Sequence, residues 1–322
     1  MNLRSLWRAL LVLLTIAAAA ELLAQDAARG AVLVALAREA IGGQKRLADV
    51  TTLQMTGTFR RVVGTNDTEG DFDVFLELPD KYLRSEKTGT PGQPSTETIE
   101  ALVGSSVRDV VRGGVGRGGR GGINAVAGGD AQPAGDAPAP GADVGDTVAP
   151  AGVDAVQPAE ASPVLVGGRG GLSSDPEGQR RARQADVNRL ALMLLLKSDV
   201  PMTWVGIAES PDGKAEVLDA RFADGQPTRL FLDITSHMPL MLQWQSIPVL
   251  PGGRRGGQRG GRGQGVPAQP VTNDMTFSEH REVNGLRLPY VITKGANGQT
   301  FERWTVTRYR VNPTLNPETF TR

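Results

Sequence analysis

The stretch DFDVFLELPDKYLRSEKT, residues 71–88, decides the class of fold. Successive side chains of a strand point to opposite faces of a sheet, so alternating apolar and polar residues predict a strand buried on one face. Residues 71–78 alternate in this way, and a second strand-like segment at 81–88 follows Pro79, a residue typical of turns. The stretch therefore predicts two consecutive antiparallel strands. The apolar face of the first carries Phe72, Val74, Leu76 and Leu78.

Similar alternation continues on both sides of this stretch, with short turns between the segments. Together the segments predict a long meander of antiparallel strands. They are residues 52–63 and, more weakly, 97–103 in the first part of the chain, and 202–209, 214–222, 228–234, 240–247, 271–283, 286–295 and 300–311 in the second.

Two segments have helical periodicity instead. In residues 27–41 an apolar stripe of Val32, Leu33, Leu36 and Ala40 predicts one amphipathic helix. Residues 179–197 predict a second helix, whose C-terminal end is apolar nearly all round and should be buried.

Two segments of low complexity interrupt the pattern. Residues 112–178 consist mainly of Gly, Ala, Pro, Asp and Val and contain too little apolar surface to offset an ordering cost of about 1 to 2 kcal/mol per residue. We expect them to form a disordered insertion. The helix and first strands at 26–111 and the second helix and remaining strands at 179–322 then belong to one half-barrel, with a flexible Arg/Gly loop at 250–268.

The Arg/Gly segment GGRRGGQRGGRGQG, residues 252–265, resembles RNA-binding sequences, but the balance of charge argues against that role. The chain has 35 basic and 35 acidic residues, whereas nucleic-acid binding depends on excess positive charge. We predict no nucleic-acid partner and a long hairpin loop here. Contact of its arginines with anionic lipid headgroups or polysaccharide remains an alternative.

The N-terminal residues indicate export. Residues 1–25 combine Arg4 and Arg8 with an apolar run from Ala9 to Ala20, which is typical of a signal peptide, and the run is short for a membrane span. We expect a soluble periplasmic protein, with an uncleaved anchor as the alternative. The 322 residues include no cysteine, which excludes a lipobox, disulfides, thiolate catalysis and cysteine zinc ligands.

No motif points to catalysis. The two histidines, His237 and His280, lack the spacing of metal ligands, and no nucleophile elbow, Walker loop or dinucleotide fingerprint is present. The sequence therefore predicts a protein that is not an enzyme and has no metal and no cofactor.

A large sheet with only two helices leaves much of its apolar face uncovered. One outcome is an apolar cleft, the usual binding site for an apolar ligand, and a dry core is the alternative. The residues expected to line the cleft are Phe72, Val74, Leu76, Tyr82, Leu230, Leu232, Leu240, Leu242 and Trp244.

Four segments together resemble the LolA and LolB superfamily of periplasmic lipoprotein carriers and related outer-membrane lipoprotein-sorting proteins. Their order and spacing carry the resemblance. They are IGGQKRLADVTTLQMTGTF (41–59), VFLELPDKYLRSE (74–86), RLFLDITSHMPLMLQWQ (229–245) and the closing stretch from 280 to 320, which contains VNGLRLPYVI and VNPTLNPETF.

The resemblance implies an α+β fold, an incomplete antiparallel β-barrel with a helical lid, whose cavity receives lipid or lipoprotein acyl chains. The family's Arg-Pro-x-x-Phe turn is altered here: Leu78 stands in place of the Arg, Pro79 is kept and Tyr82 takes the aromatic position. A lid held shut by that Arg is therefore not expected. Two alternatives to a carrier stay open, namely a sensor of the same fold that binds a membrane or envelope protein partner, and a scaffold that contacts cell-wall polysaccharide.

Overall fold

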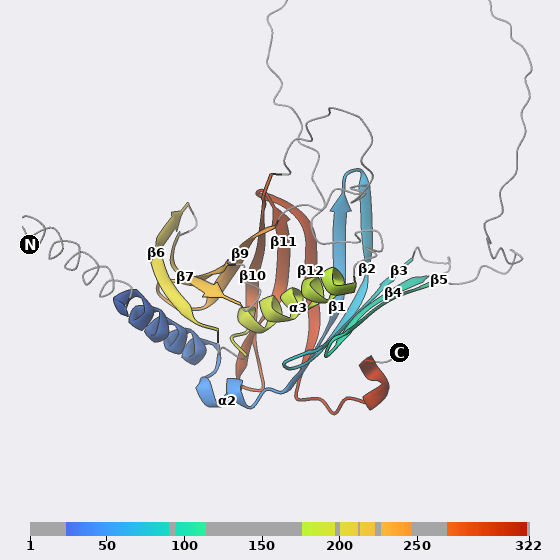
Figure 1. Ribbon diagram of the computed structural model, residues 1–322, viewed down its shortest axis with the longest axis horizontal. Helices are drawn as coiled ribbons and strands as arrows, with labels where there is room; N and C mark the ends of the chain where they lie inside the picture. The colour runs from blue at the N-terminus through green and yellow to red at the C-terminus, as the bar shows by residue number, and fades with distance from the viewer. Residues whose placement is uncertain are drawn as a thin grey trace, which may run out of the picture. The chain divides into compact units, whose positions relative to one another are not determined.

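Twelve strands form one antiparallel sheet that does not close on itself (Figure 1). The computed structural model describes residues 24–89, 95–113, 176–196, 200–211, 213–222, 227–246 and 269–320. An open sheet of this size with few helices confirms the predicted fold class, an incomplete antiparallel barrel with a small helical part. The strands are β1 (Thr52–Val63), β2 (Asn66–Glu77), β3 (Lys81–Thr88), β4 (Thr96–Val103), β5 (Ser106–Gly113), β6 (Met202–Ser210), β7 (Gly213–Arg221), β8 (Pro227–Asp233), β9 (Pro239–Ser246), β10 (Val271–Val283), β11 (Leu286–Ala296) and β12 (Gln299–Val311).

Strands from both sides of the low-complexity segment belong to this single sheet. Its order is β5-β4-β3-β2-β1-β12-β11-β10-β9-β8-β7-β6, so strands that pair are neighbours in sequence except at one seam, and β5 and β6 form the two edges. At the seam β1 pairs with β12, from Leu53 opposite Val311 to Arg61 opposite Glu302. The first and last strands of the meander thereby join its two halves.

Asn312 closes one end of this seam. Its side-chain oxygen accepts hydrogen bonds from the backbone N–H groups of Thr51 and Thr52 at 2.9 and 3.3 Å. Its side-chain nitrogen donates to the carbonyl oxygen of Asp49 at 2.9 Å. The residue has a φ of 51°, a left-handed conformation that asparagine tolerates better than most residues. Asn312 therefore holds the entry of β1 against the exit of β12.

Replacing Asn312 by alanine should lower the free energy of unfolding by about 1 to 2 kcal/mol, because these bonds are lost and the left-handed backbone becomes unfavourable. Asn312→Gly is the matched control, since glycine accepts this conformation without strain. Urea denaturation of both variants separates the two contributions. Equal stability of the alanine variant and the unchanged protein would show that the side chain does not secure the seam.

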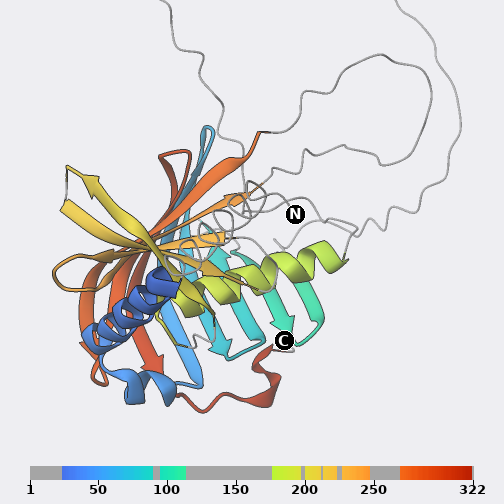
Figure 2. The same ribbon diagram turned by 60° about the vertical axis from the view of Figure 1, so that its left-hand side comes forward.

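One long helix, α3 (Pro176–Met193), crosses one face of the sheet (Figure 2). We call this side, which carries Phe72, Leu230 and Trp304, the inner face. The helix contacts β4 and β5 on one half of the sheet and β9 on the other. Every side chain from Leu190 to Leu196 is buried, as predicted for an apolar helix end. A core formed by α3 and the inner face therefore holds the molecule together.

A second helix covers residues 24–41 in the described part of the chain and is followed by the short α2 (Gln44–Ala48). The predicted stripe was partly wrong. Val32 and Leu36 are 59% and 41% exposed, whereas residues 30, 33, 37 and 41 face inward. The reason is the close approach at Gly30, where an added Cβ would lie 2.4 Å from the carbonyl oxygen of Met202 on β6. A side chain at position 30 would prevent the helix backbone from approaching the strand this closely.

Several predictions lie largely or wholly outside the described residues. These are the signal peptide at 1–25 apart from its last two residues, the insertion at 112–178 apart from its ends, and the Arg/Gly loop at 250–268. The ends of the predicted insertion are ordered elements, because residues 112–113 complete β5 and residues 176–178 begin α3. In the described part of the chain, no helix is long and apolar enough to cross a bilayer.

Candidate functional site

The structure gathers most of the predicted cleft residues in one apolar cluster on the inner face. These side chains are at most 2% exposed and pack together with the buried end of α3. They are Phe72, Val74, Leu76, Tyr82, Leu230, Leu232 and Leu242. In this conformation they form packed core, so a ligand can reach them only when a covering element moves.

Leu240 and Trp244, the two other predicted residues, are not buried in this cluster. For Leu240 the reason is an irregularity of β9. The pairing of β8 with β9 shifts after Phe231, so Leu232 lies opposite Pro239 and Leu240 has no partner. This bulge reverses the alternation, and Leu240 is 37% exposed and not part of the inner face. Trp244 is half-buried and packs against the edge of the cluster.

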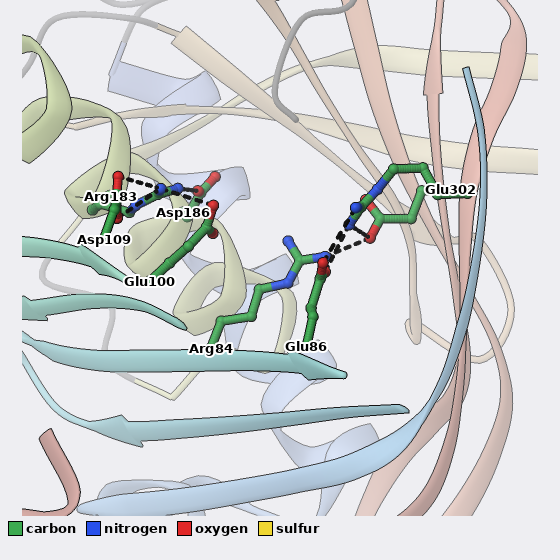
Figure 3. Close-up of polar contacts among 8 residues, drawn as sticks. Arg84, Glu86, Glu100, Asp109, Arg183, Asp186 and Glu302 are labelled. Carbon is green, nitrogen blue, oxygen red and sulfur yellow. Dashed lines mark hydrogen bonds and ion pairs between the residues drawn. The ribbon is translucent and has the colours of Figure 1, made fainter. Parts of the chain in front are cut away.

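A charged group occupies the inner face next to this apolar cluster. On β12, Glu302 lies directly opposite Arg61 of β1 and Lys294 of β11. Its carboxylate oxygens are 2.9 Å from a guanidinium nitrogen of Arg61, 2.5 Å from one of Arg84 and 3.6 Å from the ammonium nitrogen of Lys294. Glu86 pairs with the same two arginines, and Figure 3 shows it beside Arg84, directed toward Glu302. We call these five residues the central ionic network.

Mutual pairing keeps this network ionised despite its burial. Burial alone would raise the pKa of Glu302, whose side chain is 1% exposed, but Lys294, Arg84 and Arg61 hold that pKa well below its usual range. The same balance lowers the pKa of Glu86. Burial lowers the pKa of Lys294, and Glu302 opposes this effect. Glu302 is thus the carboxylate that three cations share.

Aromatic rings form the apolar floor beside the network. Phe72 on β2 and Trp304 on β12 are separated by β1, yet their ring centres are only 4.8 Å apart. On β1 the residue opposite Phe72 is Gly57, where an added Cβ would lie 3.0 Å from the Phe72 ring. The missing side chain of Gly57 therefore leaves the Phe72 ring free to lie over β1, toward Trp304.

Trp304 couples this floor to the charges. The Lys294 nitrogen lies 4.0 Å and the central guanidinium carbon of Arg84 lies 4.6 Å from the ring centre, within the range of cation–π attraction. The indole N–H donates to Glu302 at 2.6 Å. One side chain thus contacts both the apolar and the ionic part of the site.

A second set of ion pairs fastens α3 to the sheet. Arg183 lies 2.9 Å from Glu100 on β4 and 3.2 Å from Asp109 on β5, and Figure 3 shows these side chains converging. We call the three residues the α3 anchor. Farther along the helix, the central guanidinium carbon of Arg189 stacks 4.2 Å above the ring centre of Trp244 on β9. The polar part of α3 is therefore held by charges, and its C-terminal end by apolar packing.

The sequence analysis missed the ionic network because charged residues in a strand normally indicate the solvent face. A signal was present, since side chains two apart share a face. Arg84 and Glu86 therefore share the face of Tyr82 on their strand. In the same way Glu302 shares the face of Trp304, and Lys294 that of Ile292. Among the described residues, no three His, Cys, Asp or Glu side chains gather as metal ligands would.

A hollow of about 400 Å³ lies away from this site, among residues such as Thr58, Asp71 and Arg303. By the alternation of their strands, these three side chains belong to the other face of the sheet. Arg60, which also lines it, is already paired with Asp67 at 2.5 Å. Its lining has two basic side chains, Arg60 and Arg303, against two acidic ones, Glu69 and Asp71, and Phe59 is its one large apolar side chain. The inner face beneath α3 is therefore the better candidate for a binding site.

No family model and no curated protein matches the sequence. Solved structures similar to the chain include a LolA superfamily protein from Nitrosomonas europaea, with 8% identity, a TM-score of 0.43 and coverage of 91% of this chain and 97% of that one. Another is a putative outer membrane lipoprotein-sorting protein domain from Vibrio parahaemolyticus, with 9% identity, a TM-score of 0.42 and coverage of 92% and 97%. A third, a DUF1329 family protein from Desulfovibrio piger, has 9% identity, a TM-score of 0.43 and coverage of 90% and 96%. These matches include the family that the sequence resembles. At such identities and TM-scores they say nothing about a ligand. Any ligand must be inferred from the residues of this chain.

Proposed function

We propose that the protein is a non-enzymatic periplasmic binding protein or carrier that takes up lipid or lipoprotein acyl chains between α3 and the inner face of the sheet. The observation that carries this proposal is the arrangement of α3. Its C-terminal end lays an unbroken set of buried side chains, from Leu190 to Leu196, on the apolar cluster of the sheet. An acyl chain offers the same kind of surface and can replace them when the helix lifts.

The energy of such an exchange is favourable enough to be useful. Burying one methylene contributes about 0.8 kcal/mol, so a long acyl chain can replace the apolar contacts of several leucines. The inner face would then stay covered in both states, by α3 or by ligand. This exchange avoids leaving a large apolar surface in water.

The C-terminal end of α3 has a feature suited to such movement. Leu195 has a φ of 49°, in the left-handed region that glycine normally occupies at a helix end. Hydrogen bonds from the N–H of Leu195 to the carbonyl of Leu192 and from that of Leu196 to the carbonyl of Ala191 terminate the helix there. A branched residue in this conformation costs about 1 to 2 kcal/mol. Its buried side chain offsets the strain only while α3 lies on the sheet.

Binding of a fluorescent polyene fatty acid tests the proposal. We expect saturable binding of one ligand per protein, visible as a complex of that mass in native mass spectrometry. Arg183→Ala should bind about fivefold more tightly, because loss of the α3 anchor raises the population of the open state. Arg181→Ala, which changes an exposed arginine of the same helix, should leave affinity unchanged. Absence of saturable binding by the folded protein would overturn the proposal.

A further inference from the structure

The central ionic network contains more positive than negative groups. In the part of the chain that the structure describes, Arg61, Arg84 and Lys294 form ion pairs with two carboxylates, those of Glu86 and Glu302. A net positive charge at a buried site is costly unless another group compensates it. The network therefore has room for one further negative charge.

Asp186 of α3 supplies part of that compensation. Its negative charge favours the charged form of Lys294. It is not bound within the network, however: its ion pairs are with Arg189 at 3.2 Å and Arg183 at 4.0 Å, both on its own helix. Its side chain is 44% exposed. Glu100 on β4, opposite Arg84, also favours the charged form of that arginine and stays on the sheet. The part of the compensation that Asp186 supplies belongs to α3 and leaves the network when α3 lifts.

Unused hydrogen-bond donors point to the same site. Oε2 of Glu302 is buried without a hydrogen-bond partner among the described residues and lies 3.6 Å from the Lys294 nitrogen. The Nε atoms of Arg61 and Arg84 are likewise buried and without a partner there. The Arg84 side chain is 9% exposed. Buried polar groups of this kind are normally satisfied, and both belong to cations that strongly favour anionic acceptors. The site therefore has donors as well as charge to offer to an anion.

Apolar surface adjoins these donors. The ring of Trp304 contacts both Arg84 and Lys294 and also packs on Phe72, which belongs to the apolar cluster. A ligand with a long apolar chain and an anionic end would match both the apolar cluster and the adjoining central ionic network. A neutral amphiphile would match only the apolar part.

We propose that the central ionic network is the headgroup subsite of an anionic amphiphile, and that it takes the carboxylate or phosphate of the ligand when α3 lifts. The inference rests on the proposed function and adds the chemical class of the ligand. The required chemistry is one anionic oxygen group attached to an acyl or alkyl chain.

Displacement of the neutral dye Nile red by palmitate, hexadecyl phosphate and hexadecanol tests this subsite. The unchanged protein should bind the two anions about tenfold more tightly than the alcohol, because charge-assisted hydrogen bonds are stronger than neutral ones. Acetate and inorganic phosphate should not displace the dye. Displacement by these small anions at the same concentrations would show a free-anion site and overturn the headgroup assignment.

Two substitutions should shift this preference in opposite directions. Lys294→Met removes the excess charge and should abolish the preference while hexadecanol still binds, which also shows that the variant is folded. Asp186→Asn removes a negative charge of α3 that acts on Lys294 and should increase the ratio of anion to alcohol affinity. Lys87→Met is the matched control, because Lys87 is exposed on β3 immediately after Glu86.

The possible failures are distinguishable. Equal affinity for palmitate and hexadecanol, or a full preference for anions in the Lys294→Met variant, would overturn the headgroup subsite and leave acyl binding intact. Binding of none of the three amphiphiles would overturn the proposed function itself, and the subsite with it.

Discussion

Replacing Glu302 by glutamine should lower the free energy of unfolding by about 3 to 5 kcal/mol, the range seen when one partner of a buried ion pair is removed. Glutamine has nearly the same shape but no charge. The change would leave Arg61, Arg84 and Lys294 around the single carboxylate of Glu86. It would also weaken the hydrogen bond from the Trp304 indole. Few single substitutions on the sheet should be as destructive.

Urea denaturation followed by tryptophan fluorescence measures this loss. Glu69→Gln is the matched control, because Glu69 is 71% exposed on the neighbouring part of β2 and should change stability by less than about 0.5 kcal/mol. Adding Lys294→Gln to Glu302→Gln should restore part of the stability, since one uncompensated charge is removed. A loss below 1 kcal/mol for Glu302→Gln, or no recovery in the double variant, would contradict the role of Glu302 as the shared carboxylate.

The same network makes stability depend on acid pH. The pKa values of Glu86 and Glu302 are lower in the folded protein than their usual values, so the unfolded chain binds protons more readily. Their contribution to stability is therefore complete above the usual pKa of glutamate and is lost as the pH falls toward the folded values. Below about pH 5 the unfolding free energy should decrease more steeply for the unchanged protein than for Glu302→Gln.

Alternation in the sequence predicted the strands well wherever one face is buried. Residues 52–63, 81–88 and 271–283 were predicted with the bounds observed for β1, β3 and β10. The strand β5 was missed, because it lies at the edge of the sheet and its side chains are largely exposed. An edge strand has little apolar alternation for a pattern to detect.

The candidate site was only half predictable. The positions of Phe72 and Leu230 follow from alternation alone, but the exposure of Leu240 depends on a bulge, which shifts the parity of a strand without changing its composition. The ionic network depends on pairing between distant strands, since Arg61 and Glu302 meet across the seam of β1 and β12. No local pattern contains that pairing.

A covalent bridge that holds α3 on β5 should abolish acyl binding, the largest functional effect expected of any change to this chain. Arg183 and Asp109 already lie within ion-pair distance at 3.2 Å, so cysteines at both positions should be within reach of a short bismaleimide. The chain has no cysteine of its own, and the reagent can therefore react only where cysteines are introduced. Binding of the fluorescent fatty acid before and after cross-linking is the measurement.

This bridge separates movement of α3 from the chemistry of the site, because the cross-linked positions lie outside both the apolar cluster and the central ionic network. Each single-cysteine variant treated with the same reagent should still bind, since one attachment does not tether the helix. The double variant should bind before cross-linking, and cleavage of a reducible linker should restore binding afterwards. Undiminished affinity in the cross-linked protein would place the ligand elsewhere, because an acyl chain cannot occupy the inner face while residues from Leu190 to Leu196 remain packed on it.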